Sequence, residues 1–171
     1  MKFHHVCGEA VRISDDYKSA SRSDHSFSHG IVFCDAPIKL NQHVSLELKC
    51  TSLWSGALRI GVTSQNPNTL HSSDLPKYAF PDLAQKEGYW VRPVNENETF
   101  TGMKIIIYIN AIGQLHLFMN NQHRGVYISN LPTNQNLWLL FDLYGTTKAI
   151  TLVPSVNAFN SEVVSTTNQS Q

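Results

Sequence analysis

The sequence predicts an all-β protein in which antiparallel strands form a β-sandwich. Three observations carry this prediction: short segments of strand character recur between turn residues, helical periodicity is nearly absent, and a three-segment meander lies in the second half. With 171 residues the chain is long enough for one domain with a sizeable core. We therefore expect one sandwich over residues 1–154 and a flexible polar tail or linker over residues 155–171.

Two segments alternate apolar and polar residues with a period of two, the pattern of a strand with one covered face. They are residues 44–50, VSLELKC, and residues 58–63, LRIGVT. The second segment puts Arg59 on the face opposite its apolar residues, where it either meets solvent or lies on the second sheet's side. Residues 11–13 form a shorter segment of the same kind.

Three further segments, residues 31–33, 105–109 and 137–141, are almost entirely apolar. Such runs are typical of strands that are covered on both faces. The second run opens the meander: residues 110–113 turn, 115–119 return, Asn120 and Asn121 turn again, and 125–128 follow. A last strand is expected over residues 149–153, stopped by Pro154.

Residues 64–91 carry three prolines and little alternation, which predicts a long irregular excursion. The best helical candidate in it, residues 81–88, amounts to one or two turns. Long loops in compact domains tend to be functional, so the excursion is a candidate for a ligand-binding segment.

The composition excludes several classes of protein. A hydrophobic share of 42% excludes a disordered chain, and 13 Lys and Arg against 13 Asp and Glu argue against a general nucleic-acid binder. We find neither the apolar segment of a secretory signal nor a candidate membrane span. Three cysteines without paired spacing favour free thiols in the reducing cytosol, so we expect a cytoplasmic protein.

Two clusters of reactive side chains have ordinary explanations. His4, His5 and Cys7 are adjacent, but zinc needs three or four convergent ligands, and strand-edge residues explain the pattern better. Cys34 follows the apolar run 31–33, and a cysteine in that position is more often buried than nucleophilic. We therefore expect no metal, no cofactor and no catalytic residue, so that this chain alone is not an enzyme.

A series of ordered motifs resembles the Neuralized homology repeat domain. They are Phe3-His4, Gly8, Val11-Arg12-Ile13-Ser14, Ala20, Arg22, Phe27, His29-Gly30-Ile31-Val32-Phe33, the central segment 54–63 (WSGALRIGVT), Leu75-Pro76, Asp82-Leu83, Trp90 and the closing segment 142–150 (DLYGTTKAI). Within that family the stretch 144–150 is most like that of a lung-inducible member with a RING domain. The pair Asn120-Asn121 departs from relatives, which often have Asn followed by Gly.

The resemblance implies a SPRY-like sandwich of the concanavalin-like jelly-roll type that recognises substrates for ubiquitin transfer. Domains of this family bind short Asn-x-x-Asn peptides, and some bind phosphoinositides. In family members the transfer chemistry belongs to a separate RING domain, whose two zinc sites need more ligands than three cysteines supply. The expected partners are therefore peptide segments of target proteins and a ubiquitination machinery outside this chain, with no nucleic acid and only weak support for a membrane phosphoinositide.

Three positions have both a structural and a functional interpretation. Trp54 either caps the sandwich core or forms one wall of a groove at its rim. Tyr144, before Gly145, either ties its hydroxyl to the backbone as a tyrosine corner or lies against a bound peptide. Arg59, where it is half-buried, needs an acceptor that a peptide carbonyl or carboxylate could supply.

The polar segment 15–29 is expected to form a loop at one end of the sandwich, where binding loops cluster. An Asn side chain offers one acceptor and two donors, and Arg22 with Asp24 has the complementary polarity. The predicted peptide contacts are Arg22, Asp24, His29, Trp54, Arg59, Asn120, Asn121 and Tyr144. The alternatives are a sandwich that binds carbohydrate or phosphoinositide headgroups, and a structural adaptor.

Overall fold

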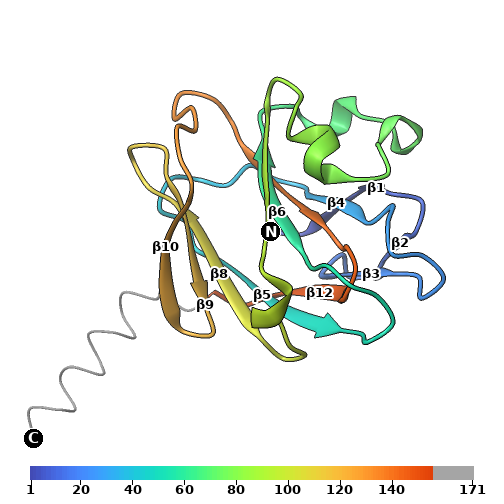
Figure 1. The fold of residues 1–171 in the computed structure, drawn as a ribbon. Helices are drawn as coiled ribbons and strands as arrows, with labels where there is room; N and C mark the ends of the chain where they lie inside the picture. The colour runs from blue at the N-terminus through green and yellow to red at the C-terminus, as the bar shows by residue number, and fades with distance from the viewer. Residues whose placement is uncertain (156–171) are drawn as a thin grey trace, which may run out of the picture.

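The computed structural model describes residues 1–155, whose strands form two antiparallel sheets that pack face to face (Figure 1). The five-stranded sheet has the order β1 (Phe3–Cys7), β4 (Ile31–Cys34), β11 (Trp138–Asp142), β6 (Arg59–Thr63), β7 (Tyr89–Pro93). The seven-stranded sheet has the order β10 (Gln122–Ile128), β9 (Leu115–Met119), β8 (Lys104–Ile109), β5 (Val44–Cys50), β12 (Thr147–Val153), β3 (Ser19–Arg22), β2 (Val11–Ile13). The predicted β-sandwich is confirmed.

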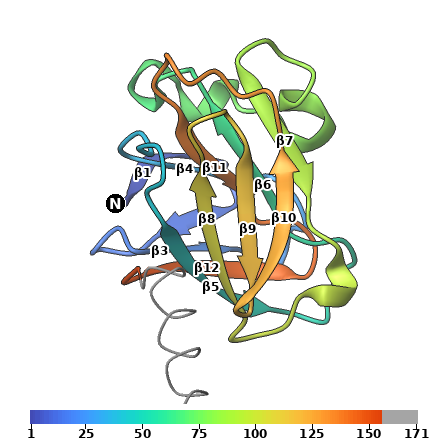
Figure 2. The ribbon, with the colours of Figure 1, turned by 90° about the vertical axis from the view of Figure 1, so that its left-hand side faces the viewer.

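Most predicted strands are present within a residue or two of their expected bounds. β5 has the predicted bounds, and the meander β8–β9–β10 lies together at one side of the seven-stranded sheet, as Figure 2 shows. Three strands were not predicted: β1, β3 and β7. β1 and β7 are edge strands, and β3 is short and polar, so none has a regular apolar alternation.

Two hydrophobic layers explain the apolar runs of β4 and β11. β4 alternates between them: Val32 points into the main core between the sheets, whereas Ile31 and Phe33 point outward into a second cluster. That cluster is completed by Leu83 and other residues of the segment between β6 and β7, which packs on the outer face of the five-stranded sheet. The expectation that β4 and β11 are covered on both faces is therefore confirmed.

The covering segment, residues 64–88, is irregular as predicted. It contains the 3-10 turns η1 (Pro67–Thr69) and η2 (Ser72–Asp74) and a single π-helical turn, η3 (Ala79–Leu83). The helix expected over residues 81–88 is therefore wrong in its bounds, because the helical turn begins two residues earlier and ends at Leu83. Another 3-10 turn, η4 (Glu96–Glu98), lies in the connection between β7 and β8.

The expected turn at Asn120 and Asn121 joins β9 to β10 directly, because Met119 pairs with Gln122. Both asparagines have positive φ angles, 52° and 68°, which Asn tolerates better than other residues with a side chain. The turn therefore forms without a glycine.

The strand registers place the connections after β3, β5, β7, β9 and β11 at one end of the sandwich, which we call the rim. The predicted loop 15–29 is corrected by this arrangement. β3 divides it, so Asp16 and Lys18 lie at the opposite end and only residues 23–30 belong to the rim.

No helix among the described residues is long and apolar enough to cross a membrane. The predicted tail over 155–171 lies outside the described residues except for Ser155.

We predict that the second hydrophobic cluster holds the segment 64–88 in place. Leu83→Ala should lower the free energy of unfolding by about 2 to 5 kcal/mol, because a buried leucine leaves a cavity. Ile112→Ala, at a side chain that is 74% exposed, should change it by less than about 0.5 kcal/mol. Urea denaturation measures both, and equal effects would contradict this role of Leu83.

Candidate ligand-binding rim

Four aromatic side chains from four connections meet on the rim. Phe27 lies 5.5 Å from Trp54 and 6.0 Å from Tyr144 between ring centroids, and Tyr78 lies 6.0 Å from Tyr144. All four are half-buried, so each ring packs on its neighbours and still meets solvent. Together with Arg59 and Lys77 we call these residues the rim cluster.

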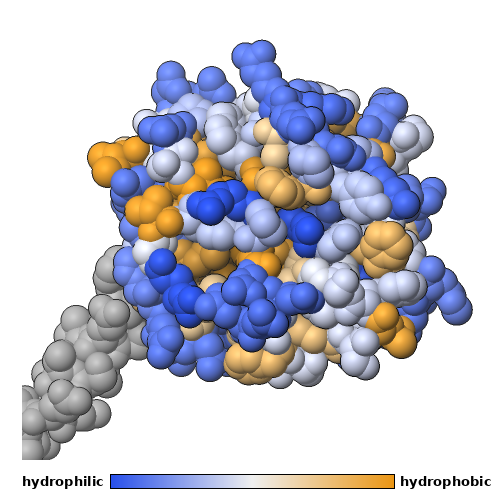
Figure 3. Space-filling model, viewed as in Figure 1, coloured by the Kyte–Doolittle hydropathy of each residue, from blue (hydrophilic) through white to orange (hydrophobic). Residues whose placement is uncertain are grey.

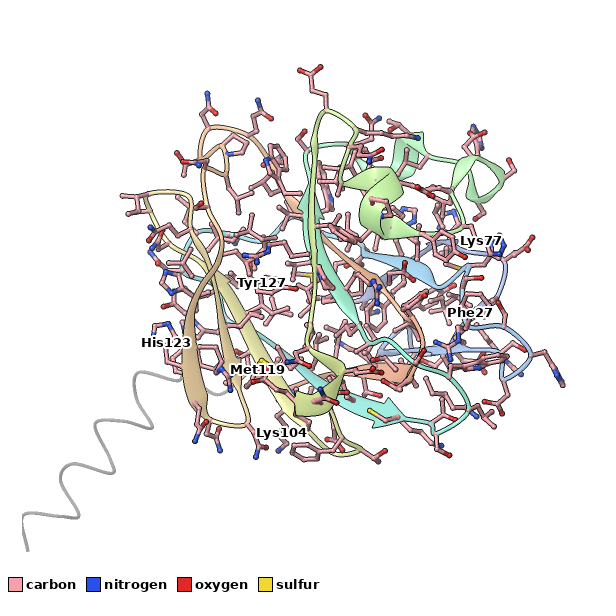
Figure 4. The ribbon with its side chains drawn as sticks, viewed as in Figure 1. Phe27, Lys77, Lys104, Met119, His123 and Tyr127 are labelled. Carbon is pink, nitrogen blue, oxygen red and sulfur yellow. The ribbon has the colours of Figure 1, made fainter. Side chains whose placement is uncertain are left out.

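Two cations accompany the aromatic rings. The Arg59 guanidinium stacks on the Tyr144 ring, with Cζ 3.8 Å from the centroid, and donates to the carbonyl of Ala57. The Lys77 ammonium lies 5.4 Å from the centroids of both Phe27 and Tyr78. Figure 4 shows Phe27 and Lys77 side by side, although they come from connections far apart in the sequence. Cation–π contacts of this kind hold a charged group against aromatic rings at the surface.

Arg22 is a buried part of the scaffold. Its Nη1 donates to the carbonyls of Leu143 and Thr147, at 2.6 and 2.8 Å, and its Nη2 donates to that of Gly145 at 2.7 Å. Its side chain is only 2% exposed, so it cannot reach a ligand. The predicted contact role of Arg22 is therefore corrected to a positioning role: the guanidinium fixes the β11–β12 turn that carries Tyr144.

The β11–β12 turn also packs directly on the connection that carries Trp54. Thr146 donates both its amide and its hydroxyl to the carbonyl of Gly56, at 2.9 and 2.7 Å. A Cβ atom at Gly145 would lie 2.1 Å from the carbonyl oxygen of Ser55, so this close approach requires glycine. Gly56 has φ 85°, and a Cβ there would lie 2.4 Å from the Tyr144 ring.

Asp142, which the sequence analysis missed, connects the segment 64–88 to the rim. Its Oδ2 accepts the amide of Ala79 at 2.9 Å, which places Tyr78 and Lys77 beside Tyr144. Burial raises the pKa of the Asp142 carboxyl to about 6, against the opposing effects of the Ala79 amide, Arg59 and Arg22. The sequence did contain a signal for this role, because Asp142 is a single acidic residue within an apolar run that ends at Leu143.

The other predicted contacts from the connection 23–30 are already engaged with their neighbours. Asp24 forms an ion pair with Lys148, at 2.7 Å, so the expected pairing of Arg22 with Asp24 toward a ligand is not present. His29 has φ 57°, donates its amide to the carbonyl of Lys77 at 3.1 Å, and lies 3.5 Å from Glu9. His29 therefore joins the β3–β4 connection to the segment 64–88.

Neither Trp54 nor Tyr144 has the structural arrangement considered for it in the sequence analysis. Trp54 is outside the main core and packs on Phe27 at the surface. The Tyr144 hydroxyl forms no backbone hydrogen bond within residues 1–155, so no tyrosine corner is present there. Phe27, Lys77 and Tyr78 complete the cluster, and only Phe27 had a sequence signal, its place in the family motif.

Asn120 and Asn121 lie at the rim end but apart from the cluster. The turn follows Met119, which Figure 4 places well away from Phe27. The exposed side chains at this turn therefore face a different part of the rim.

The described residues contain no group of three or more His, Cys, Asp or Glu side chains that could hold a metal ion. Burial raises the pKa of the Cys34 thiol, which disfavours the thiolate that a nucleophile requires. What the rim offers is a preformed set of aromatic faces and hydrogen-bond donors, the features of a binding surface.

Comparison with known proteins identifies the family. A family model described as Neuralized matches residues 3–154. The chain belongs to the Neuralized family. Protein neuralized of Drosophila melanogaster is 33% identical over 156 residues, and E3 ubiquitin-protein ligase NEURL1B of Homo sapiens is 32% identical over 159 residues. E3 ubiquitin-protein ligase NEURL3 of Homo sapiens is 32% identical over 155 residues. These similar identities do not single out one member of the family.

The Neuralized relatives are longer than the matched region. The matches cover 91%, 92% and 90% of this chain but 20%, 28% and 59% of the Drosophila protein, NEURL1B and NEURL3. The chain therefore spans about a fifth of the length of the Drosophila relative. NEURL1B and NEURL3 are named as E3 ubiquitin-protein ligases, and both proteins are longer than the region that matches this chain.

Solved structures place the fold in the same family. The crystal structure of the Drosophila melanogaster neuralized-nhr1 domain has a TM-score of 0.86 at 33% identity, over 90% of this chain and 98% of that one. The TRIM65 PSpry domain covers 90% of this chain and 89% of that one, with a TM-score of 0.59 at 15% identity, a likeness of fold alone. The predicted Neuralized homology repeat and its SPRY-like sandwich are both confirmed.

The raised pKa of Asp142 predicts a specific pH dependence of stability. Because the folded-state pKa of about 6 exceeds the unfolded value of about 3.9, the folded protein binds the proton more tightly. The contribution of Asp142 to the free energy of unfolding should therefore rise, by roughly 2 kcal/mol, as the pH falls from 7 to 4.

Asp142→Asn keeps an oxygen for the Ala79 amide and removes the titration, so it is the matched control. The difference in unfolding free energy between the two proteins, from urea denaturation at several pH values, should change across this range. A constant difference from pH 7 to 4 would show that Asp142 does not titrate as inferred.

Proposed function

We propose that the rim cluster recognises short peptide segments of target proteins that contain asparagine, such as Asn-x-x-Asn. The carrying observation is that Phe27, Trp54, Tyr78 and Tyr144 converge on one surface from four separate connections. Arg22 on β3 and Asp142 on β11 hold the backbone of the connections that carry Tyr144 and Tyr78. The surface is therefore formed before a ligand arrives. Preorganisation of this kind reduces the entropy cost of binding.

The polar groups of the cluster suit an amide ligand. Arg59 and Lys77 are the donors of the cluster. These groups complement the side-chain carbonyl of an asparagine and the backbone carbonyls around it. The hydroxyl groups of Tyr78 and Tyr144 can accept the two N–H groups of the amide.

As part of the same proposal, recognition serves ubiquitin transfer by a RING domain outside this chain. The support is the family's named E3 ubiquitin ligases, whose sequences extend beyond the matched region. Three cysteines do not supply the ligands of a RING, so this chain would select the target and another domain would carry out the transfer. The free cysteines are consistent with target selection in the reducing cytoplasm.

Binding of labelled peptides, measured by fluorescence anisotropy, tests the proposal. An Asn-x-x-Asn peptide should bind with a dissociation constant of about 1 to 100 μM, because a short flexible chain loses entropy on binding. An Ala-x-x-Ala peptide of the same length is the control and should bind at least tenfold more weakly. Equal binding of both peptides, or of neither, would contradict asparagine recognition.

A lipid or sugar ligand predicts a different outcome for the same protein. Phosphoinositide liposomes or soluble glycans would then bind while the asparagine peptide would not. That result would replace the peptide proposal with a headgroup-binding or carbohydrate-binding function.

We predict that Arg59→Ala weakens the Asn-x-x-Asn affinity about tenfold, because a hydrogen bond from a charged donor contributes about 1.5 kcal/mol or more. Arg12→Ala, at an exposed position on β2 outside the rim cluster, should leave the affinity unchanged. An Arg59→Ala protein that is folded and binds as tightly as the unmodified one would remove Arg59 from the site.

A further inference from the structure

A small apolar cavity opens between the two sheets, beside the rim cluster and distinct from it. β7 and β10 are edge strands of the two sheets, and the gap between them is lined by Val94, Leu117, Met119 and Val126. Leu117 and Met119 are 2% and 7% exposed and form the floor, whereas Val126 is 45% exposed at the mouth. Figure 3 shows an apolar recess on this face with hydrophilic side chains above and below it.

Two polar bridges frame the cavity. At one end Arg92 on β7 donates to the carbonyl of Tyr127 on β10 at 2.7 Å, and the Tyr127 hydroxyl donates to the carbonyl of Arg92 at 2.5 Å. At the other end Arg124 on β10 forms an ion pair with Glu98 in the β7–β8 connection. The bridges hold the sheet edges at a fixed separation, so the opening is a feature of the folded chain.

The cavity has the size and lining for one aliphatic side chain. Its volume is about 190 Å³, below the roughly 300–1,000 Å³ of pockets that hold a drug-sized ligand. Its floor is formed by Leu117 and Met119, and the flexible methionine side chain adapts to irregular aliphatic groups. An aliphatic side chain that entered it would leave water for a largely apolar surface.

Residues 94–96 connect this cavity to the rim cluster. Val94, which lines the cavity, donates its amide to the carbonyl of Leu58 at 2.9 Å. Glu96 accepts the amide of Gly56 at 2.6 Å, and Gly56 adjoins Tyr144. The cavity therefore begins within a few residues of the surface that carries Trp54. An extended peptide advances about 3.3 Å per residue, so one peptide that lies at the rim cluster can continue toward the cavity.

We infer that this cavity is a second subsite for the same peptide, which takes a Leu, Ile or Met side chain a few residues from the asparagine motif. The inference rests on the proposed function, since it needs a peptide held at the rim. The peptide would then contain two recognised parts, an asparagine motif at the rim cluster and an aliphatic side chain in the cavity.

Three peptides that share one Asn-x-x-Asn segment test the inference. One carries Leu four residues before and after the motif, another carries Ser at both positions, and the last carries Asp. Anisotropy titrations should give the Leu peptide about fivefold or higher affinity over the Ser peptide, with the Asp peptide no tighter than the Ser peptide.

Two matched variants localise the effect. Val126→Glu places a charge at the cavity mouth and should abolish the advantage of Leu while leaving the Ser peptide's affinity unchanged. Ile112→Glu, at an exposed position at the opposite end of the sandwich, should preserve the advantage. Methyl NMR signals of Leu117 and Met119 should shift with the Leu peptide only.

The outcomes separate this inference from the proposed function. If the three peptides bind equally and better than an Ala-x-x-Ala control, asparagine recognition stands and the second subsite is overturned. If none binds better than that control, the proposed function itself fails. If Leu improves binding equally in the Val126→Glu protein, the aliphatic side chain binds elsewhere and the assignment of this cavity is overturned.

Discussion

The shape of the rim depends on one buried guanidinium. Arg22 donates to three carbonyls of the segment 143–147, which are 121 to 125 residues away in sequence. Carbonyl groups in a tight turn would otherwise lie buried without donors, at a cost of about 1–3 kcal/mol each. By satisfying them together, Arg22 fixes the turn that presents Tyr144 and that packs on the connection carrying Trp54. In the function that we propose, the arginine therefore acts through backbone geometry and makes no contact with the ligand.

A second constraint brings the long segment between β6 and β7 to the same place. Its apolar residues pack on the outer face of the five-stranded sheet, and Asp142 holds the amide of Ala79. Asp142 is the last residue of β11, and Arg22 donates to the carbonyl of the next residue, Leu143. The two buried polar side chains therefore lie at the same end of β11. This arrangement explains how aromatic side chains from four connections form one surface, and why glycine is required at the contact of Gly145 with Ser55.

The sequence predicted the parts of the fold that depend on local patterns. Val44–Cys50 alternates regularly and forms the strand it predicts, and the asparagine pair forms its turn. Ser19–Arg22 was missed because its buried positions hold an alanine and an arginine, so it lacks an apolar stripe. The role of Arg22 could not be predicted for the same reason: its partners are carbonyls that only the tertiary fold brings near. Tyr78 lay within an irregular segment and had no periodic signal, whereas Trp54, Arg59 and Tyr144 could be selected from the family motifs.

The central claim is that Arg22 forms the binding surface without touching the ligand, and Arg22→Lys tests it most directly. A lysine keeps the charge but cannot donate to all three carbonyls in the fixed geometry of a guanidinium. Affinity for the Asn-x-x-Asn peptide should be measured together with amide hydrogen exchange. We expect slow exchange to persist in β5 and β8, faster exchange over residues 143–147, and at least tenfold weaker binding. A folded Arg22→Lys protein with unchanged exchange over 143–147 and unchanged affinity would contradict the account.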